Sequence, residues 1–475
     1  MDQVILFLNS IALILIFVPS NISFLLYIFF YIKSRKYVEP RPSKTNVEGV
    51  VSVILPVRKE PLEYIDEALK SIYDWGLGGN VEVIIVSDDP YEYYLKIDKL
   101  AQKWKTKGLN VYVIWRRYPR GFKAGALNTA LWFSRGKYVY VMDVDSRVSR
   151  DFIVTASNIL RENNKVVAVV ARWHGRNRDT RIAEAISASM KVVVDSIYRG
   201  RSALGLPVYP LGTGTLYKAG FLKNVLHGWD EERYLAEDLE IGCRIMGLGG
   251  GILFLDSHKV SLDVPRKYSS FVVQQERWVS GAVDVLLTRL KYILKSPQPW
   301  YAKLDLIWYL LQYFPAISTL LGALILMVTL AIAPYDVLRL YWYLGLPWVV
   351  LAGVYGRFYI ESLRSEGYGL WRSVVNLGRS AAITTALTPV FTKAFFKSLF
   401  RIKMEFKRTP KGRYESIWRG LRFPYEALIG IMAFLYSIYL LIGGLSYTGG
   451  WFLIYSLGYI YSVIRWWREI LFKPS

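Results

Sequence analysis

The chain has almost none of the residues that form disulfides or bind transition metals. Its 475 residues include one cysteine, Cys243, and three histidines, which lie far apart at His174, His227 and His258. A single cysteine excludes an intrachain disulfide framework and any zinc cluster built on thiolates. The wide spacing of the histidines also argues against a histidine-based metal site.

Negative charge is scarce, and four long stretches carry no charge at all. Lys and Arg number 60 against 38 for Asp and Glu, which gives a formal net charge of +22. Charged residues are absent from Gln3 to Ile32, Leu306 to Ala333, Leu340 to Gly356 and Ala427 to Ile464. The last run is too long for one membrane span and is broken by the turn-like "IGGLSYTGG". We therefore expect five spans in total.

Basic residues are distributed unevenly on the two sides of these spans. The expected outer segments are the N-terminus and the turns at 334–339 and 443–450, and they contain one basic residue, Arg339. This asymmetry predicts a multi-pass protein of the cell membrane whose large uninterrupted domain is cytoplasmic. It also accounts for the net charge without nucleic acid, for which the sequence has no recognisable binding motif.

Between Val50 and Asp263 the chain alternates short apolar runs with helical stretches. Residues 50–56, 81–89, 111–115 and 138–145 are predicted strands, and 61–75 and 121–134 are predicted helices. This alternation predicts a doubly wound parallel sheet, in which ligands bind beyond the carboxyl ends of the strands. Acidic residues follow three of the strands, so we expect them at one edge of the sheet. They are Glu60, Asp88 with Asp89, and Asp143 with Asp145.

The pair Asp143 and Asp145 has a chemical interpretation. Alternate residues of an extended chain face the same side, so the two carboxylates can share one cation. The alternative is a solvated loop after a strand, because this spacing arises by chance roughly once in a chain of this composition.

Together with four further motifs, this pair makes the chain resemble the processive, membrane-embedded enzymes of glycosyltransferase family 2. Bacterial cellulose synthase catalytic subunits, hyaluronan synthases and chitin-oligosaccharide synthases are examples. The motifs are "GFKAGALN", "LAEDLEIG", "QQERW" and "FKRTPKG", and the resemblance extends from about Val50 to Lys411. It implies an α/β fold of the GT-A type, Rossmann-like with a mostly parallel sheet, in a cytoplasmic domain inserted into an α-helical transmembrane bundle.

The expected division of the chain follows from the spans and the resemblance together. Residues 1–47 form a transmembrane anchor with a basic linker, and 48–266 form the GT-A domain. Residues 267–304 form interfacial amphipathic helices. Residues 305–475 form a membrane domain with about four spans, which includes an interfacial helix at 373–403 and a gating-like loop at 404–414.

The resemblance also implies roles for individual residues. Asp143 and Asp145 hold Mg²⁺ or Mn²⁺ on the diphosphate of a nucleotide-sugar, and Asp238 is the general base. The nucleotide-sugar is bound by Glu60, Asp88 or Asp89, Lys123 and Arg277. The acceptor is bound by Trp278, Gln274, Glu237, Gly212, Thr213 and Gly214. The gating loop contains Phe406, Thr409 and Lys411.

These roles suit the chemistry, but each motif also has a plain structural interpretation. Cleaving a sugar–phosphate bond leaves a charged diphosphate, which a metal ion, an ammonium and a guanidinium can neutralise. On the other hand, "QQERW" could be one face of an amphipathic helix, and Glu60 could be an acid at a helix N-terminus. Gly212 and Gly214 could form an ordinary turn, and "FKRTPKG" could be a basic linker.

The sequence thus predicts an inverting, metal-dependent hexosyltransferase that uses a nucleotide-sugar, expected to be a UDP-sugar, to elongate a polysaccharide and translocate it across the membrane. One alternative is transfer of a single sugar to a lipid acceptor such as ceramide, diacylglycerol or a polyprenyl phosphate. Another is a non-catalytic nucleotide-sugar sensor. The expected partners are the donor, a glycan or lipid acceptor, the bilayer, and an accessory subunit or second copy.

Overall fold

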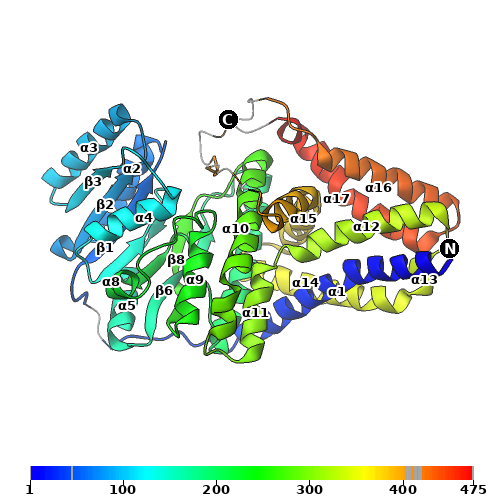
Figure 1. Ribbon diagram of the computed structural model, residues 1–475, viewed down its shortest axis with the longest axis horizontal. Helices are drawn as coiled ribbons and strands as arrows, with labels where there is room; N and C mark the ends of the chain where they lie inside the picture. The colour runs from blue at the N-terminus through cyan, green and yellow to red at the C-terminus, as the bar shows by residue number, and fades with distance from the viewer. Residues whose placement is uncertain are drawn as a thin grey trace.

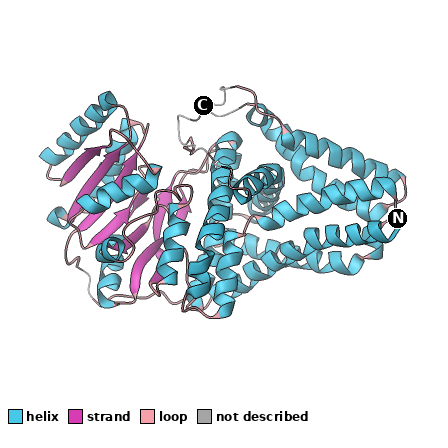
Figure 2. Cartoon of the chain, viewed as in Figure 1, coloured by secondary structure: helices cyan, strands magenta, loops and turns pink. Residues whose placement is uncertain are grey.

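Strands and long helices lie at opposite ends of the molecule. The structure, a computed structural model, describes residues 2–43, 46–402, 404, 406, 408–410, 415 and 420–472. All strands belong to one sheet at one end, and the other end is a bundle of helices (Figure 2). The four predicted strands are all present in the sheet, which confirms the expected α/β class.

The sheet has eight strands in the order β3-β2-β1-β4-β7-β6-β8-β5. Their bounds are β1 Val51–Val57, β2 Val81–Ser87, β3 Val111–Trp115, β4 Tyr138–Val141, β5 Ser146–Val148, β6 Val166–Gly175, β7 Thr215–Lys218 and β8 Gly251–Leu262. The first four strands run parallel to one another, and β6 is parallel to β8. Strand β7 is antiparallel to both β4 and β6. The carboxyl ends of β1, β2 and β4 therefore meet at one edge.

The strand predicted at 138–145 is shorter than expected. Strand β4 ends at Val141, and Asp143 and Asp145 lie in the turn that leads to β5. The argument from alternating side chains on an extended strand was therefore wrong for this pair. The turn is closed instead by the backbone amide of Ser146, which donates to the carbonyl oxygen of Asp143 at 2.9 Å.

Helices cover both faces of the sheet because its strands are apolar on both sides. Val53 and Leu55 of β1 pack in one core, and Ile54 between them packs in the other. The core that contains Val53 and Leu55 is covered by α2 Leu62–Tyr73, α3 Tyr91–Thr106 and α5 Arg150–Glu162. The core that contains Ile54 is covered by α4 Phe122–Phe133, α8 Ala219–Asn224 and α9 Glu237–Gly247.

In the helix bundle, the first helix of the chain packs against helices from the second half of the sequence. Helix α1, Asp2–Ser34, packs against α12, Phe314–Ile332, and α14, Trp342–Arg364, although more than 250 residues separate them (Figure 1). A hairpin of α16, Tyr425–Ile442, and α17, Ser446–Leu471, completes the bundle. The strand-rich domain is thus inserted between α1 and the remaining bundle helices.

Three helices are long and apolar enough to cross a membrane: Gln3–Ser34, Phe314–Ile332 and Tyr425–Ile442. Helices α14 and α17 coincide with the other two predicted spans, and the count of five stays a prediction. The charge-free run from Leu306 to Ala333 is not one helix. Residues 311–313 form a turn that separates α11, Trp300–Leu310, from α12, whose first turn contains Pro315.

Two long helices cross the direction of the bundle where the bundle meets the strand-rich domain (Figure 1). They are α10, Tyr268–Lys295, and α15, Leu370–Leu399, and they pack against each other. Helix α10 also packs against α9. Their position suits the expected interfacial helices, and the proposed domain division stays a prediction.

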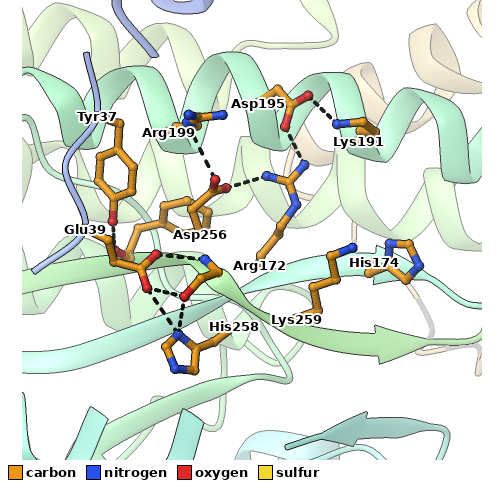
Figure 3. Close-up of polar contacts among 12 residues, drawn as sticks. Tyr37, Glu39, Arg172, His174, Lys191, Asp195, Arg199, Asp256, His258 and Lys259 are labelled. Carbon is orange, nitrogen blue, oxygen red and sulfur yellow. Dashed lines mark hydrogen bonds and ion pairs between the residues drawn. The ribbon is translucent and has the colours of Figure 1, made fainter. Parts of the chain in front are cut away.

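A buried ionic cluster joins the sheet to the helical end (Figure 3). Helix α6, Arg181–Val193, continues into the π-helical turn η2, Val194–Tyr198, and then into α7, Arg199–Ala203. Asp195 of this turn is paired with Arg172 of β6 and with Lys191, and it accepts a hydrogen bond from Ser362 of α14. Arg172 also pairs with Asp256 of β8. The cluster therefore links two strands to a bundle helix.

We predict that Asp195→Ala destabilises the protein strongly, because it leaves Lys191 as a buried cation without its carboxylate. Breaking a buried pair in this way costs roughly 3–5 kcal/mol. The matched control is Asp74→Ala, which breaks an exposed pair with Lys70 and should leave stability unchanged. Thermal unfolding of the protein in lipid nanodiscs measures both, and equal melting temperatures for the two variants would contradict the prediction.

Candidate functional site

One cavity connects the edge of the sheet with the interior of the helix bundle. It has a volume of about 1680 Å³. Asp88, Asp143 and Asp145 border it at the carboxyl ends of the strands, whereas Trp348 of α14 and Trp451 of α17 border it within the bundle. Glu60, which follows β1, borders it as well, so the three acidic strand ends expected to meet at one edge face a common space.

The turn that carries Asp143 and Asp145 is fixed by its neighbours. The backbone amide of Asp143 donates to the hydroxyl of Thr213 at 3.1 Å, and this hydroxyl lies 2.8 Å from that of Ser146. Thr213 and Asp145 are both buried. The hydroxyl of Thr213, predicted to bind an acceptor, is thus engaged in holding the acidic turn.

Lys123, in the first turn of α4, joins three separate loops. Its Nζ lies 2.9 Å from Oδ1 of Asp143 and 3.0 Å from Oε1 of Glu237, and it donates to the carbonyl oxygen of Gly212 at 2.7 Å. Burial alone would lower the pKa of Lys123, but the two carboxylates raise it well above its usual value. The ammonium group is therefore charged at the centre of an acidic site.

Asp238, in the first turn of α9, borders the cavity beside Glu237. Burial, and then the neighbouring Glu237 carboxylate, raise the pKa of Asp238 to about 6. A carboxylate with this pKa is deprotonated at neutral pH and still basic enough to accept a proton. A Cβ atom at Gly212 would lie 3.2 Å from Oδ2 of Asp238, so a side chain there would crowd the carboxylate.

Four residues of "QQERW" border the cavity from α10: Gln274, Gln275, Arg277 and Trp278. Within the described part of the chain, the buried Nε of Arg277 has no hydrogen-bond partner. Its guanidinium lies 5.3 Å from the ring centre of Phe406. The motif therefore faces the site and contributes a cation to it.

The segment predicted as a gating loop lies against the same site. The ring of Phe406 stacks on that of Phe122 with centroids 4.9 Å apart, and Arg408 forms an ion pair with Glu60. Phe406, Thr409 and Glu60 border the cavity. Lys411 lies outside the described residues.

Two predicted residues do not border the cavity. Asp89 is buried, and its carboxylate accepts hydrogen bonds from the amide of Lys59 and the hydroxyl of Ser87. Gly214 has a φ of +88°, and a Cβ atom there would lie 2.6 Å from Val260, so turn geometry and packing account for this glycine. Of the two candidate aspartates after β2, Asp88 is the one that faces the site.

Three residues at the site were missed in the sequence. Arg116 forms a two-pronged ion pair with Asp88, with Nε 2.6 Å from Oδ1. Trp173, at the end of β6, lies beside Trp278, and Arg408 binds Glu60. Arg116 directly follows a predicted strand, so the rule used for the aspartates could have found it. Trp173 and Arg408 had no such signal.

Comparison with known proteins identifies the family. Residues 138–356 match the family model "Glycosyl transferase family group 2". A protein of Sulfolobus acidocaldarius named "Probable glycosyltransferase" is 32% identical over 98% of this chain and 99% of its own length. The chain belongs to glycosyltransferase family 2. It is therefore a hexosyltransferase that uses a nucleotide-sugar.

More distant members of glycosyltransferase family 2 match part of the chain. Glucomannan 4-beta-mannosyltransferase 1 of Cyamopsis tetragonoloba is 26% identical over 54% of this chain and 51% of its own length. The chain thus spans about half the length of such plant relatives. The structure of a mannosyltransferase of Pyrobaculum calidifontis, solved with GDP-Man and Mn²⁺, superimposes on this one with a TM-score of 0.52 and 18% sequence identity. The superposition covers 83% of this chain and all of the solved chain. This likeness supports the GT-A-type fold.

We predict that the rate of transfer falls below about pH 6, because Asp238 is then protonated. Glu237→Gln removes the carboxylate that raises the pKa of Asp238, so the acidic limb of the kcat/KM profile should move to lower pH. Glu232→Gln, which alters an exposed residue of the same region, should leave the limb in place. A limb that stays fixed in Glu237→Gln would contradict the assignment of Asp238 as the base.

Proposed function

We propose that this protein elongates a glycan by inverting hexosyl transfer and passes the product through its helix bundle. The observation that carries this proposal is the continuity of the cavity from Asp238 into the bundle. Asp238 removes the proton from an acceptor hydroxyl, whose oxygen attacks the anomeric carbon of the donor from the side opposite the diphosphate. The bond from this carbon to the diphosphate breaks, and the nucleoside diphosphate leaves.

The charges of the site suit a departing diphosphate. Four of the carboxylates that border the cavity lie in the region of Lys123 and Arg277, and a bound divalent cation would offset their negative charge; they are Asp143, Asp145, Glu237 and Asp238. Carboxylate oxygens are ligands that Mg²⁺ and Mn²⁺ prefer. No cluster of three or more potential ligands occurs among the described residues, so diphosphate oxygens would complete the coordination of a metal held by Asp143 and Asp145. Such a metal would stabilise the leaving group.

The wall of the cavity within the bundle suits an uncharged carbohydrate. Among the described lining residues of α1, α11, α12, α13 (Val337–Leu340), α14, α15 and α17, only Arg379 is charged, and it is paired with Glu184 at 3.0 Å. Hydroxyl groups such as those of Thr385 and Thr388, and indole rings such as that of Trp451, lie there among aliphatic side chains such as that of Ile383. Hydroxyl and aromatic groups bind sugars by hydrogen bonds and by contact with apolar ring faces.

Transfer of a single sugar to a lipid is the second candidate function, because an acyl chain could also occupy an apolar cavity in a bundle. A polyprenyl phosphate fits less well than ceramide or diacylglycerol. Glu237 and Asp238 would repel a phosphate, and a phosphate nucleophile needs no general base. The geometry therefore favours a hydroxyl acceptor, either on a glycan or on a lipid.

The identity of the donor and the orientation in the membrane are further parts of the proposal. The family resemblance implies a UDP-sugar, and the names of the mannosyltransferase relatives add GDP-mannose as a donor to be assayed beside it. Three candidate spans support membrane association. The distribution of basic residues supports a cell-membrane location with the sheet domain on the cytoplasmic side. In the same scheme, Phe406 and the Arg408–Glu60 ion pair cover the donor.

We predict that excess EDTA abolishes transfer, that Mn²⁺ or Mg²⁺ restores it, and that Asp145→Asn lowers it by more than about 100-fold. Asp151→Asn, an exposed change on α5, is the matched control and should behave as the wild type. Retention of the native melting temperature shows that Asp145→Asn is folded. Full turnover of the wild type in EDTA would contradict metal dependence.

The size of the product at low donor conversion decides between the two candidate functions. The purified protein in nanodiscs is supplied with labelled UDP-sugars or GDP-mannose, and the products are separated into aqueous and lipid fractions. Elongation predicts long chains from few initiation events while most acceptor remains unused. Label confined to a lipid carrying one hexose would instead establish single transfer.

A further inference from the structure

Two tryptophans from different elements stand side by side at the acceptor end of the site. Trp173 lies on β6 and Trp278 on α10, and the centres of their rings are 6.3 Å apart at an interplanar angle of 32°. Both rings are partly exposed, and both border the cavity that contains Asp238. Two neighbouring aromatic rings therefore border the cavity.

Trp173 is held by the loop that also holds the reacting groups. Its indole Nε1 donates to the carbonyl oxygen of Thr213 at 2.8 Å. Thr213 in turn fixes the amide of Asp143, and the adjacent Gly212 binds Lys123. This hydrogen bond uses the polar edge of the indole and fixes the orientation of the ring. The position of Trp173 is thus set relative to Asp143 and Lys123.

The surroundings of the pair supply the remaining groups of a sugar-binding site. The buried amides of Gln274 and Gln275 border the same cavity and can donate to and accept from sugar hydroxyls. An apolar surface with a few convergent polar groups is the usual composition of a binding site for a small neutral ligand.

We propose that Trp173 forms a second sugar subsite beside Trp278, the acceptor-binding residue implied by the resemblance, so that the acceptor is a glycan of at least two sugar units. This inference rests on the proposed elongation function and names its acceptor class. Trp278 contacts the sugar that carries the attacking hydroxyl, and Trp173 contacts a neighbouring sugar of the same chain. A single hydroxyl on a lipid would leave the Trp173 subsite unused.

The test is the dependence of transfer on acceptor length. Manno- and cello-oligosaccharides of one to four units serve as acceptors for the full protein in nanodiscs at saturating donor. The wild type should show a kcat/KM that rises from one unit to two by about tenfold, the gain expected from one aromatic contact. Trp173→Ala should lose this gain, so that its kcat/KM is the same with one unit as with two.

Two further variants distinguish the loss of an aromatic contact with the acceptor from an effect on folding. Trp173→Phe keeps an aromatic ring without the indole donor and should keep most of the preference for two units. Trp132→Ala removes an exposed tryptophan on α4, outside the cavity, and should behave as the wild type. An equal loss by Trp173→Ala with every acceptor and in donor hydrolysis would show a structural role only and overturn the inference.

The failure of the proposed function has a different signature. Donor hydrolysis without transfer to any oligosaccharide by the wild type would overturn the glycan acceptor itself, and the subsites with it. Transfer by the wild type that is independent of acceptor length would leave elongation in place and overturn the second subsite alone.

Discussion

The whole site depends on one buried ammonium group. Lys123 contacts Asp143, Glu237 and the carbonyl oxygen of Gly212, which belong to three loops far apart in the sequence. Without it, the acidic turn after β4 and the acidic start of α9 would repel each other across a poorly solvated cavity. Burial and the Glu237 carboxylate raise the pKa of Asp238, and the positive charge of Lys123 limits this rise. Lys123 thus allows the groups proposed to bind the diphosphate and the base to share one space.

The cavity changes its chemical character along its length. At the edge of the sheet it is rich in charge, which suits a nucleoside diphosphate and a metal ion. Within the bundle it is lined by hydroxyl, aromatic and aliphatic side chains, and its one charged lining residue in the described helices is paired. Helix α10 contributes side chains of both kinds to the lining, the cation of Arg277 and the aromatic ring of Trp278. The donor chemistry and a path for the product are therefore combined in one space.

The sequence predicted the features that depend on local pattern. Valine- and isoleucine-rich runs identified β1 to β4, and the acids that follow them identified the edge at which the site lies. The sequence did not show whether Asp88 or Asp89 faces the site, since this depends on which of the two carboxylates accepts a hydrogen bond from the amide of Lys59. Trp173 and Trp278 become neighbours only when β6 meets α10, and Arg408 becomes the partner of Glu60 only when its segment lies against the sheet domain. The break between α11 and α12 escaped notice because an uncharged turn leaves no mark in a hydropathy pattern.

The most direct test of this account is the structure of the protein determined in a lipid bilayer during synthesis, with donor and metal present. The account predicts a glycan whose reacting end lies beside Asp238, which contacts Trp278 and then Trp173 and continues among α15 and α17. A bundle cavity filled by the acyl chain of a lipid that carries a single hexose at Asp238 would contradict it.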